Sequence, residues 1–404
     1  MTTTPTAPAT PLPAPHSAGC PFGPPPAYTE AAATASLTRG KLPGGESCWL
    51  ATGYAEVRAI LSDRRFSADL RHPTFPLLVA GDREQLTDNP SFLNRDDPEH
   101  ARLRRMVTGD FLVKRVQAMR PDIQRIVDEA LDAMTEGRTE ADLVADFALP
   151  VPSLVICLML GVPYEDHEFF QSISRTLLTS TSTNEQRLAA RDEMLAYLEE
   201  LTARKRAQPQ DDILSRLAAR DDLTPRDVAG TGFLLLIAGH ETTANMISLS
   251  TALLVDRPEQ VARLADPAAL PGAVEELLRY LTIVHTGVAR VALEDVELGG
   301  VTVRAGEGVI AMLSTANRDE ELFGGPGLLP PDELDVDRDA RRHLAFGFGV
   351  HQCLGQPLAR AELQIALATL FRRLPGLRLA VPREELAFRT DSFIYGMRSL
   401  PVTW

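Results

Sequence analysis

The sequence is poor in cysteine, and its cysteines form no metal-binding or disulfide pattern. Cys20, Cys48, Cys157 and Cys353 are scattered along 404 residues without a C-x-x-C pair. Zinc sites and disulfide frameworks normally show closely spaced or regularly patterned cysteines. We therefore expect neither in this chain, and its cysteine usage fits the reducing cytoplasm.

Long apolar runs and a basic leader are also missing. No apolar stretch is long and uninterrupted enough to span a bilayer, and no basic residue followed by an apolar run opens the chain. We expect a cytoplasmic protein without a membrane segment. A G-x-G-x-x-G motif after a strand is absent too, and Gly230-Thr231-Gly232 is too weak a substitute. No flavin- or nicotinamide-binding domain is expected.

Positive charge is in deficit. The chain has 41 Lys and Arg against 55 Asp and Glu, which gives 41 − 55 = −14. Such an acidic balance disfavours nucleic acid or an anionic membrane as a global partner. We expect a monomer that binds a small molecule.

The first 26 residues are compositionally distinct from the rest. They are rich in Pro, Thr and Ala, and no charged side chain precedes Glu30. This composition predicts a flexible or extended tail over residues 1–26. No internal repeat is found, and residues 27–404 are expected to form a single domain, although length alone would allow two or three.

The most informative segment surrounds Cys353. It runs from His343 to Arg360 and sets two glycines before the cysteine and one after it, which is too much glycine for a regular strand or helix. Leucines then recur at helical spacing from Leu363 to Leu374. Cys353 should therefore lie at the N-terminal end of a buried helix, where a thiolate is stabilised.

Three interpretations of Cys353 compete. A lone cysteine is often a small buried hydrophobic residue, but the surrounding glycines argue against that. A catalytic nucleophile could use His351, although catalytic Cys and His residues normally come from distant segments. The third interpretation is a thiolate ligand to haem iron.

A second segment is a long helix with a polar centre. Thr224-Pro225-Arg226-Asp227 has the pattern of a helix start, and the helical run continues to about Val255. Residues 238–245, Ala-Gly-His-Glu-Thr-Thr-Ala-Asn, interrupt its apolar middle. Because buried polar groups are costly without partners, they indicate a hydrogen-bonded network, a helix bend or a functional site.

These segments together support a family resemblance. Phe346-x-x-Gly349-x-His351-x-Cys353-x-Gly355 resembles the haem-thiolate signature of the cytochrome P450 monooxygenases, and the resemblance extends from about Cys48 to the C-terminus. The soluble bacterial branch is the most similar. The resemblance implies a mainly α fold with a smaller β-rich lobe, shaped as a triangular prism. Haem b would lie between the long central helix and the helix after Cys353.

The resemblance also assigns roles to individual residues. Cys353 would be the axial ligand, in a loop shaped by Phe346, Gly347 and Gly355. Ala238-Gly239-x-Glu241-Thr242 is similar to the oxygen-activation motif: Ala238 would lie beside the haem, Gly239 would leave room for dioxygen, and Thr242 and Glu241 would deliver protons. The haem propionates would be held by His100, Arg104, Arg290 and His351.

The expected substrate is a large apolar molecule such as a polyketide, macrolide, peptide antibiotic, terpenoid or steroid-like compound, which would be hydroxylated or epoxidised. The Pro-rich loop 72–98 would cover the pocket. Its walls would include Leu235, Ile283, Val284, Thr286, Val288, Phe393 and Ile394.

Electrons would come from NAD(P)H through a separate ferredoxin and ferredoxin reductase. The basic side chains expected near the docking site are Arg102, Arg105, Lys114 and Arg115. Two alternatives remain open: a haem-thiolate peroxygenase or isomerase without an electron partner, and a haem protein that binds gas without turnover.

One departure from the family pattern concerns its structural core. Glu276-x-x-Arg279 resembles a buried ion pair of the family. Many relatives supply a third member from Pro-x-Arg-Phe, where this chain has Pro331-Asp332-Glu333-Leu334. Arg338 is the candidate replacement.

Overall fold

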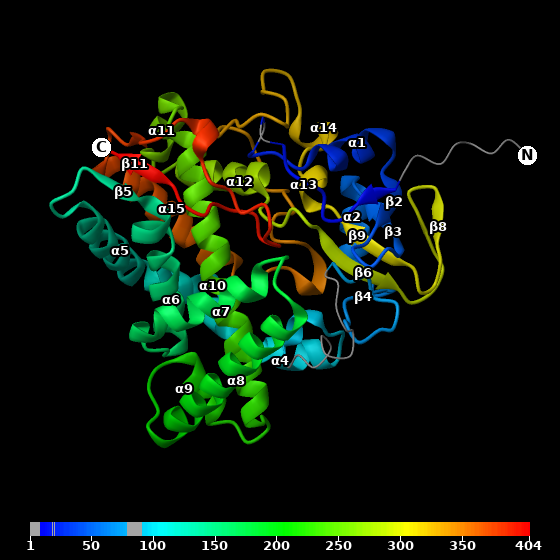
Figure 1. Cartoon of the computed structure of the whole chain (residues 1–404), viewed down its shortest axis with the longest axis horizontal. Coiled ribbons are helices and arrows are strands. Elements are labelled where there is room, and N and C mark those ends of the chain that lie inside the picture. Colours follow the sequence, from blue (N-terminus) through cyan, green and yellow to red (C-terminus); the bar gives the residue numbers. More distant parts are fainter. Residues whose placement is uncertain (1–8, 18, 20, 79–90) are drawn as a thin grey trace, which may run out of the picture.

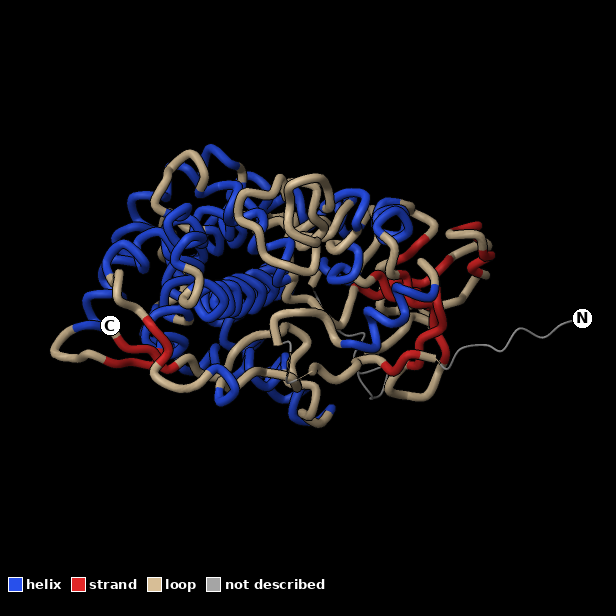
Figure 2. Tube along the Cα trace, turned by 90° about the horizontal axis from the view of Figure 1, so that it is seen from above, coloured by secondary structure: helices blue, strands red, loops and turns tan. Residues whose placement is uncertain are grey.

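The computed structural model describes residues 9–17, 19, 21–78 and 91–404. Helices make up most of the molecule, while most strands gather at the end from which the N-terminal trace leaves (Figures 1 and 2). The prediction of a mainly α fold with a smaller β-rich lobe is confirmed.

The helices are α1 (Pro26–Thr34), α2 (Tyr54–Ser62), α4 (Glu99–Thr108), α5 (Val113–Thr135), α6 (Pro150–Leu160), α7 (His167–Leu178), α8 (Asn184–Ala207), α9 (Ile213–Ala218), α10 (Pro225–Leu254), α11 (Pro258–Leu264), α12 (Leu270–Leu281), α13 (Leu313–Ala316), α14 (Glu320–Phe323) and α15 (Gln356–Arg373). Short 3₁₀ turns include η1 (Phe92–Asn94), η2 (Gly109–Phe111), η4 (Tyr164–Asp166), η5 (Gly349–His351) and η6 (Arg383–Glu385), and η3 (Val144–Ala148) is a π-helical turn. The strands are β1 (Thr10–Pro11), β2 (Leu37–Lys41), β3 (Ser47–Ala51), β4 (Phe66–Ser67), β5 (Glu140–Asp142), β6 (Val288–Ala292), β7 (Val296–Leu298), β8 (Val301–Val303), β9 (Gly308–Ala311), β10 (Arg378–Leu379) and β11 (Pro401–Thr403).

The main sheet joins distant parts of the chain. Its strand order is β1-β2-β3-β9-β6-β4. β3 and β9 are parallel, with Trp49 opposite Val309, and β6 runs antiparallel to β9 with Arg290 opposite Val309. This register places Arg290 on β6, between β9 and β4, although about 240 residues separate it in sequence from β3 on the other side of β9.

Helix α10 is the long helix that the sequence predicts. The Thr224 hydroxyl accepts a hydrogen bond from the Asp227 backbone N–H, and the Asp227 carboxylate accepts one from the Thr224 N–H. This capping box and Pro225 in the first turn fix where the helix begins. Because α10 packs against α6, α8 and α15, most of its length is buried.

The described part of residues 9–26 is extended, one of the two forms expected of it, and it packs against the rest of the chain; the boundary of the tail at residue 26 stays a prediction. β1 pairs with β2, and Leu12 and Ala14 are buried. The Ala14 N–H donates to the Tyr28 hydroxyl at 2.8 Å. Alternating apolar side chains in an uncharged segment can still bury enough surface to order it, which the overall composition does not reveal. The assignment of residues 27–404 to one domain stays a prediction.

A buried ionic cluster fastens α12 to the segment that precedes the cysteine loop. Glu276 and Arg279 are fully buried, with Nε to Oε2 at 2.6 Å and Nη2 to Oε1 at 2.8 Å. Arg338 also donates to Glu276, with Nε to Oε1 at 3.2 Å. Arg338 is therefore the third member of the cluster, as the sequence suggested.

Two further observations bear on earlier expectations. None of the helices in the described ranges is long and apolar enough to cross a bilayer. Residues 79–90 of the loop that was expected to cover the pocket lie outside the described part of the chain.

Candidate active site

The loop around Cys353 has the bent backbone that its glycines predict. Gly349 has φ +73°, and a side chain there would clash with the Leu61 carbonyl oxygen of α2. Gly347 also has a positive φ, of +68°. The Cys353 N–H donates to the Phe346 carbonyl at 2.8 Å, and α15 begins at Gln356. The prediction that Cys353 lies at the N-terminal end of a helix is confirmed.

The Cys353 thiol is accessible, whereas Cys48 and Cys157 are buried. Burial nevertheless raises the pKa of the Cys353 thiol, while the backbone N–H of Gly355 and the charge of Arg104 lower it. Cys353 is thus accessible although the protein around it is dense enough to shift its pKa. This contradicts the interpretation of Cys353 as a packed core residue.

His351 does not pair with Cys353 as a nucleophile's base would. Its ring lies against the His100 ring, with a centroid distance of 4.1 Å. Among the described contacts, no hydrogen bond joins His351 to the thiol. The catalytic-nucleophile interpretation therefore has no geometric support.

The middle of α10 presents an accessible strip inside the protein. Ala238 is exposed and Thr242 half-buried, although their neighbours His240 and Glu241 are buried. Residues four apart lie on one helix face. The Thr242 hydroxyl donates to the Ala238 carbonyl at 2.8 Å, so its oxygen remains free to accept from this face.

Glu241 has a partner that the sequence did not reveal. Its carboxylate, 3% exposed, accepts from Arg389 Nη1 at 2.7 Å. Arg389 comes from the C-terminal segment and also borders a recess of about 340 Å³ beside Leu178 and Ser392. An ion pair across nearly 150 residues leaves no local pattern in the sequence.

Gly239 is also needed for packing between helices. A side chain on Gly239 would meet Ile156 of α6, with its Cβ 2.8 Å from Cγ1. The glycine therefore allows close packing of α10 on α6, a contact that the motif alone does not reveal because the direction of a Cβ depends on helix rotation. The role of Gly239 in making room for dioxygen stays a prediction.

The four residues expected to bind propionates come together from three distant segments. Burial, followed by the charges of Arg290, His100 and Arg104, lowers the pKa of His351 to about 3. Arg104 Nη2 donates to the Gln352 carbonyl at 2.5 Å. Arg290 is 7% exposed, and its burial lowers its pKa to about 10.

These residues fit haem b. The buried Nε2 atom of His100 has no hydrogen-bond partner among the described residues, and the nearest acid to this ring is Asp97, at 3.2 Å from Nδ1. A cluster so rich in cationic groups is suited to bind carboxylates such as two propionates. Cys353 directly precedes α15, and α15 packs against α10, the helix with the accessible strip, as a flat group between them requires. When bound, haem iron with a thiolate ligand binds dioxygen and favours O–O cleavage.

A second ionic group holds the cysteine loop. Arg360 of α15 donates to Glu275 of α12 through Nε at 2.6 Å and Nη2 at 2.9 Å, and lies over the Phe346 ring at 4.6 Å. His343 Nε2 is 3.1 Å from the same carboxylate. This group holds Phe346 in place. Because the Phe346 carbonyl accepts a hydrogen bond from the Cys353 N–H, the group also helps to fix the orientation of the thiol.

Glu362 of α15 is another residue that sequence analysis missed. It is 1% exposed, neither of its carboxyl oxygens has a hydrogen-bond partner among the described residues, and burial raises its pKa to about 8. At neutral pH the acid is therefore mostly protonated and can donate a hydrogen bond. An acidic residue at an apolar position of the helix was the signal available in the sequence.

We expect Glu362→Gln to change how stability depends on pH. An acid whose pKa is raised on folding stabilises the protein below its unfolded pKa, and this stabilisation is lost as the pH rises toward 8. The loss is at most about 1.4 kcal/mol per pH unit. The thermal midpoint of the variant should therefore rise relative to wild type between pH 5 and pH 8. A constant difference would contradict this prediction.

The predicted pocket segments meet in the structure. The Tyr395 N–H donates to the Ile283 carbonyl at 2.8 Å, and the Phe393 N–H donates to the Leu178 carbonyl at 3.1 Å. Residues 283–288 and the turn at 393–394 therefore lie side by side. Leu235, Ile283 and Thr286 are buried, whereas the remaining predicted pocket residues, Val284, Val288, Phe393 and Ile394, are partly accessible.

The predicted docking residues differ in their surroundings. Arg105, Lys114 and Arg115 are exposed, next to Leu112 and Val113, which are 55% and 62% exposed. Arg102 instead lies 3.6 Å from the Asp227 carboxylate at the start of α10.

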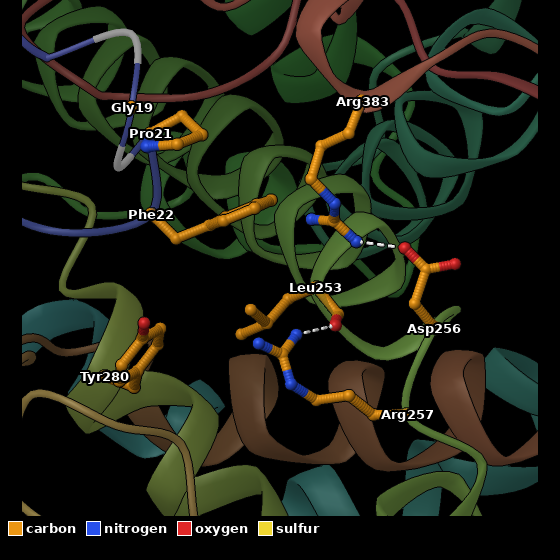
Figure 3. A pocket seen from close by; sticks show the side chains of 8 residues that line it. All are labelled: Gly19, Pro21, Phe22, Leu253, Asp256, Arg257, Tyr280 and Arg383. Carbon is orange, nitrogen blue, oxygen red and sulfur yellow. Dashed lines mark hydrogen bonds and ion pairs between the residues drawn. The ribbon is translucent and has the colours of Figure 1, made fainter.

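Figure 3 shows the side chains that line a second recess, of about 410 Å³. Arg383 lines it, pairs with Asp256 at 2.5 Å and lies over the Phe22 ring at 5.4 Å. The recess contains none of the predicted site residues.

Comparisons with known proteins agree with this geometry. The family described as "Cytochrome P450" matches residues 42–266 and 268–377. Cytochrome P450-SU2 of Streptomyces griseolus is 62% identical over 394 residues, 97% of this chain and 96% of that protein. Pentalenic acid synthase of Streptomyces avermitilis is 49% identical over 98% of both chains.

A solved structure is also closely similar. The mycinamicin VIII C21 methyl hydroxylase MycCI of Micromonospora griseorubida, bound to mycinamicin VIII, has a TM-score of 0.91 and 39% identity and covers 98% of this chain and 100% of its own. With the thiol loop, the oxygen-side motif and the basic cluster in place, this chain belongs to the cytochrome P450 family of monooxygenases.

Proposed function

We propose that this protein inserts one oxygen atom of dioxygen into a large apolar small molecule, by hydroxylation or epoxidation. The observation that carries the proposal is the accessible Cys353, which directly precedes a helix that packs against α10, the helix whose accessible strip carries Thr242. A thiolate that would hold haem iron and groups that would handle protons are what such chemistry needs.

The residues have distinct tasks in this proposal. Cys353 would hold the haem iron through its thiolate, which the Gly355 N–H and the charge of Arg104 would stabilise. His100, Arg104, Arg290 and His351 would hold the propionates.

On the oxygen side, Thr242 presents its hydroxyl oxygen, and Glu241 supplies protons while Arg389 holds its carboxylate in place. Ala238 beside Thr242 leaves the helix face open.

The substrate class is inferred from the relatives and from the pocket walls. The names of the two similar enzymes point to pentalenic acid and mycinamicin VIII. The expected walls, at Leu235, residues 283–288 and residues 393–394, are mostly apolar. We therefore expect a polyketide, macrolide, peptide antibiotic, terpenoid or steroid-like substrate.

The electron supply belongs to the same proposal. Electrons from NAD(P)H would arrive through a ferredoxin and its reductase in the cytoplasm, with the ferredoxin on the monomer's surface near Arg105, Lys114 and Arg115. Exposed Leu112 and Val113 would add apolar contact at that surface. Arg102 contributes less, because Asp227 already engages it.

Replacing Thr242 with Ala should uncouple electron use from product formation. The variant keeps the helix but lacks the hydroxyl that would manage protons on the oxygen side. We expect product per NADPH to fall about tenfold, within the range of one general acid–base group, while NADPH consumption continues. Thr242→Ser is the matched control, because it retains the hydroxyl. An unchanged ratio in Thr242→Ala would contradict the role.

Turnover conditions separate the proposal from its alternatives. A ferredoxin, its reductase and NADPH should support steady product formation. Full rates with hydrogen peroxide alone, without ferredoxin, its reductase and NADPH, would identify a peroxygenase. Tight carbon monoxide binding without product from any screened apolar compound would favour a gas-binding protein. Compounds for this screen are those that displace the sixth ligand of the ferric haem and shift its Soret band.

A further inference from the structure

Three rings from three distant segments form one stack. His16 of the N-terminal segment lies 4.0 Å from the Tyr395 ring and 4.8 Å from the His285 ring, centroid to centroid. His285 and Tyr395 are themselves stacked at 4.7 Å. Interplanar angles between 14° and 26° show that the rings are nearly parallel.

A directed hydrogen bond accompanies the stack. His285 Nε2 lies 2.9 Å from the Leu281 carbonyl, so this nitrogen carries the proton, and Nδ1 must accept. His16 Nε2, at 3.1 Å from that Nδ1, is then the donor. Burial lowers the pKa of His16 to about 4 and that of His285 to about 3, so both rings are neutral near pH 7.

The stack connects both segments that the proposed function places at the pocket. His285 lies between Ile283 and Thr286, and Tyr395 directly follows Ile394. The Tyr395 N–H donates to the Ile283 carbonyl, so the two segments touch through backbone as well. His16 contacts the rings of both.

The N-terminal segment is anchored well enough to act as a fixed support. Leu12 and Ala14 are buried at 3% and 7% exposure, and β1 pairs with β2. Farther along, Phe22 makes an edge contact with Phe388 of the C-terminal segment, at 5.8 Å. His16 therefore lies in an irregular segment that is anchored on both sides, by β1 and Leu12 before it and by Phe22 after it.

We infer that His16 is a specificity-determining positioning residue, whose ring sets the spacing between residues 283–288 and the 393–394 turn. The inference rests on the proposed function, because that assigns both segments to the substrate pocket. Histidine suits the role since it stacks and donates at once. A phenylalanine at position 16 would also stack, but it would leave His285 Nδ1 without a hydrogen-bond donor. In the wild-type protein, the buried His16 Nδ1 atom has no hydrogen-bond partner among the described residues.

The test compares a large and a small ligand of the haem iron. Ketoconazole fills the pocket, whereas imidazole needs only the iron and its immediate surroundings. Each is titrated into the purified ferric holoenzyme and followed by its Soret shift. For His16→Ala we expect the Kd of ketoconazole to change about tenfold, roughly the effect of one lost buried contact, while the Kd of imidazole stays within about twofold.

Two further variants sharpen the comparison. His16→Phe keeps the stack without the hydrogen bond and should shift the ketoconazole Kd less than His16→Ala does. It also decides the question if His16→Ala does not fold. His167→Ala is the matched control, since it removes a histidine stacked on a tyrosine, Tyr164 at 4.5 Å, outside both segments. It should leave the ratio of the two Kd values at the wild-type level.

The outcomes are distinguishable. Unchanged ketoconazole affinity in folded His16 variants, or equal changes for both ligands, would overturn the inference. The proposed function is checked separately on the same samples by the carbon monoxide spectrum of the reduced protein. A thiolate-type spectrum with an unaltered Kd ratio rejects only the role of His16, whereas a histidine-type spectrum rejects the function itself.

Discussion

Under carbon monoxide, the reduced wild-type protein is expected to show the strongly red-shifted Soret band of thiolate-ligated haem, and Cys353→Ser should lose it. The thiol is the only side chain of the loop placed to donate sulfur, and a serine oxygen cannot replace that electron donation. Altering the surroundings of a metal ligand costs up to about 100-fold in activity. Because losing the ligand itself should cost more, we expect monooxygenase turnover to fall by at least about 100-fold.

Two controls make this result specific. Cys157→Ser changes a buried cysteine of α6 and should retain the band, because its thiol belongs to the core. Haem content measured on both variants separates a lost ligand from a lost cofactor. A red-shifted band that persists in Cys353→Ser would mean that Cys353 is not the axial ligand.

Arg279→Ala should cost about 3–5 kcal/mol of stability, the range for breaking a buried ion pair. Glu276 and Arg279 have 0% exposed side chains, so the carboxylate would stay buried with only Arg338 and the Asp335 backbone N–H as partners among the described residues. Arg279 also donates to the carbonyls of Asn317 and Pro331, both at 2.7 Å, and these would lose their donor. A loss of this size is a large share of a typical protein's stability.

An exposed pair provides the matched control. Arg125 and Glu129 of α5 lie 3.0 Å apart with side chains 55% and 59% exposed. Arg125→Ala should cost at most about 1 kcal/mol. Urea denaturation or thermal midpoints of the two variants make the comparison. Similar losses of stability in both variants would show that burial does not make the Glu276 cluster more stabilising than an exposed ion pair.

Local sequence patterns predicted the parts of the site that are built locally. The glycines around Cys353 and the capping residues of α10 act on neighbouring backbone, so their positions in the sequence carry the geometry. The four propionate-binding candidates came instead from the resemblance to the family, and the structure brings these residues together.

Three contacts between distant segments could not be predicted. Arg389 reaches Glu241 across the fold, Glu362 of α15 lies near Thr243 of α10, and His16 joins the pocket segments from the opposite end of the chain. None of the three leaves a local pattern in the sequence, since each depends on how helices and loops pack. The contact of Gly239 with Ile156 was hidden for the same reason: the motif was visible, but the direction in which a side chain there would point was not.

The basic cluster of His100, Arg104, Arg290 and His351 has a consequence for protein production. A ligand that binds only the folded state stabilises it by mass action, by about 2.7 kcal/mol when its free concentration is 100 times its Kd. Because propionates would relieve the mutual repulsion that lowers the pKa of His351, haem belongs to this class of ligand. The supply of haem in the producing cell should therefore determine how much folded protein accumulates, as well as how much of it is active.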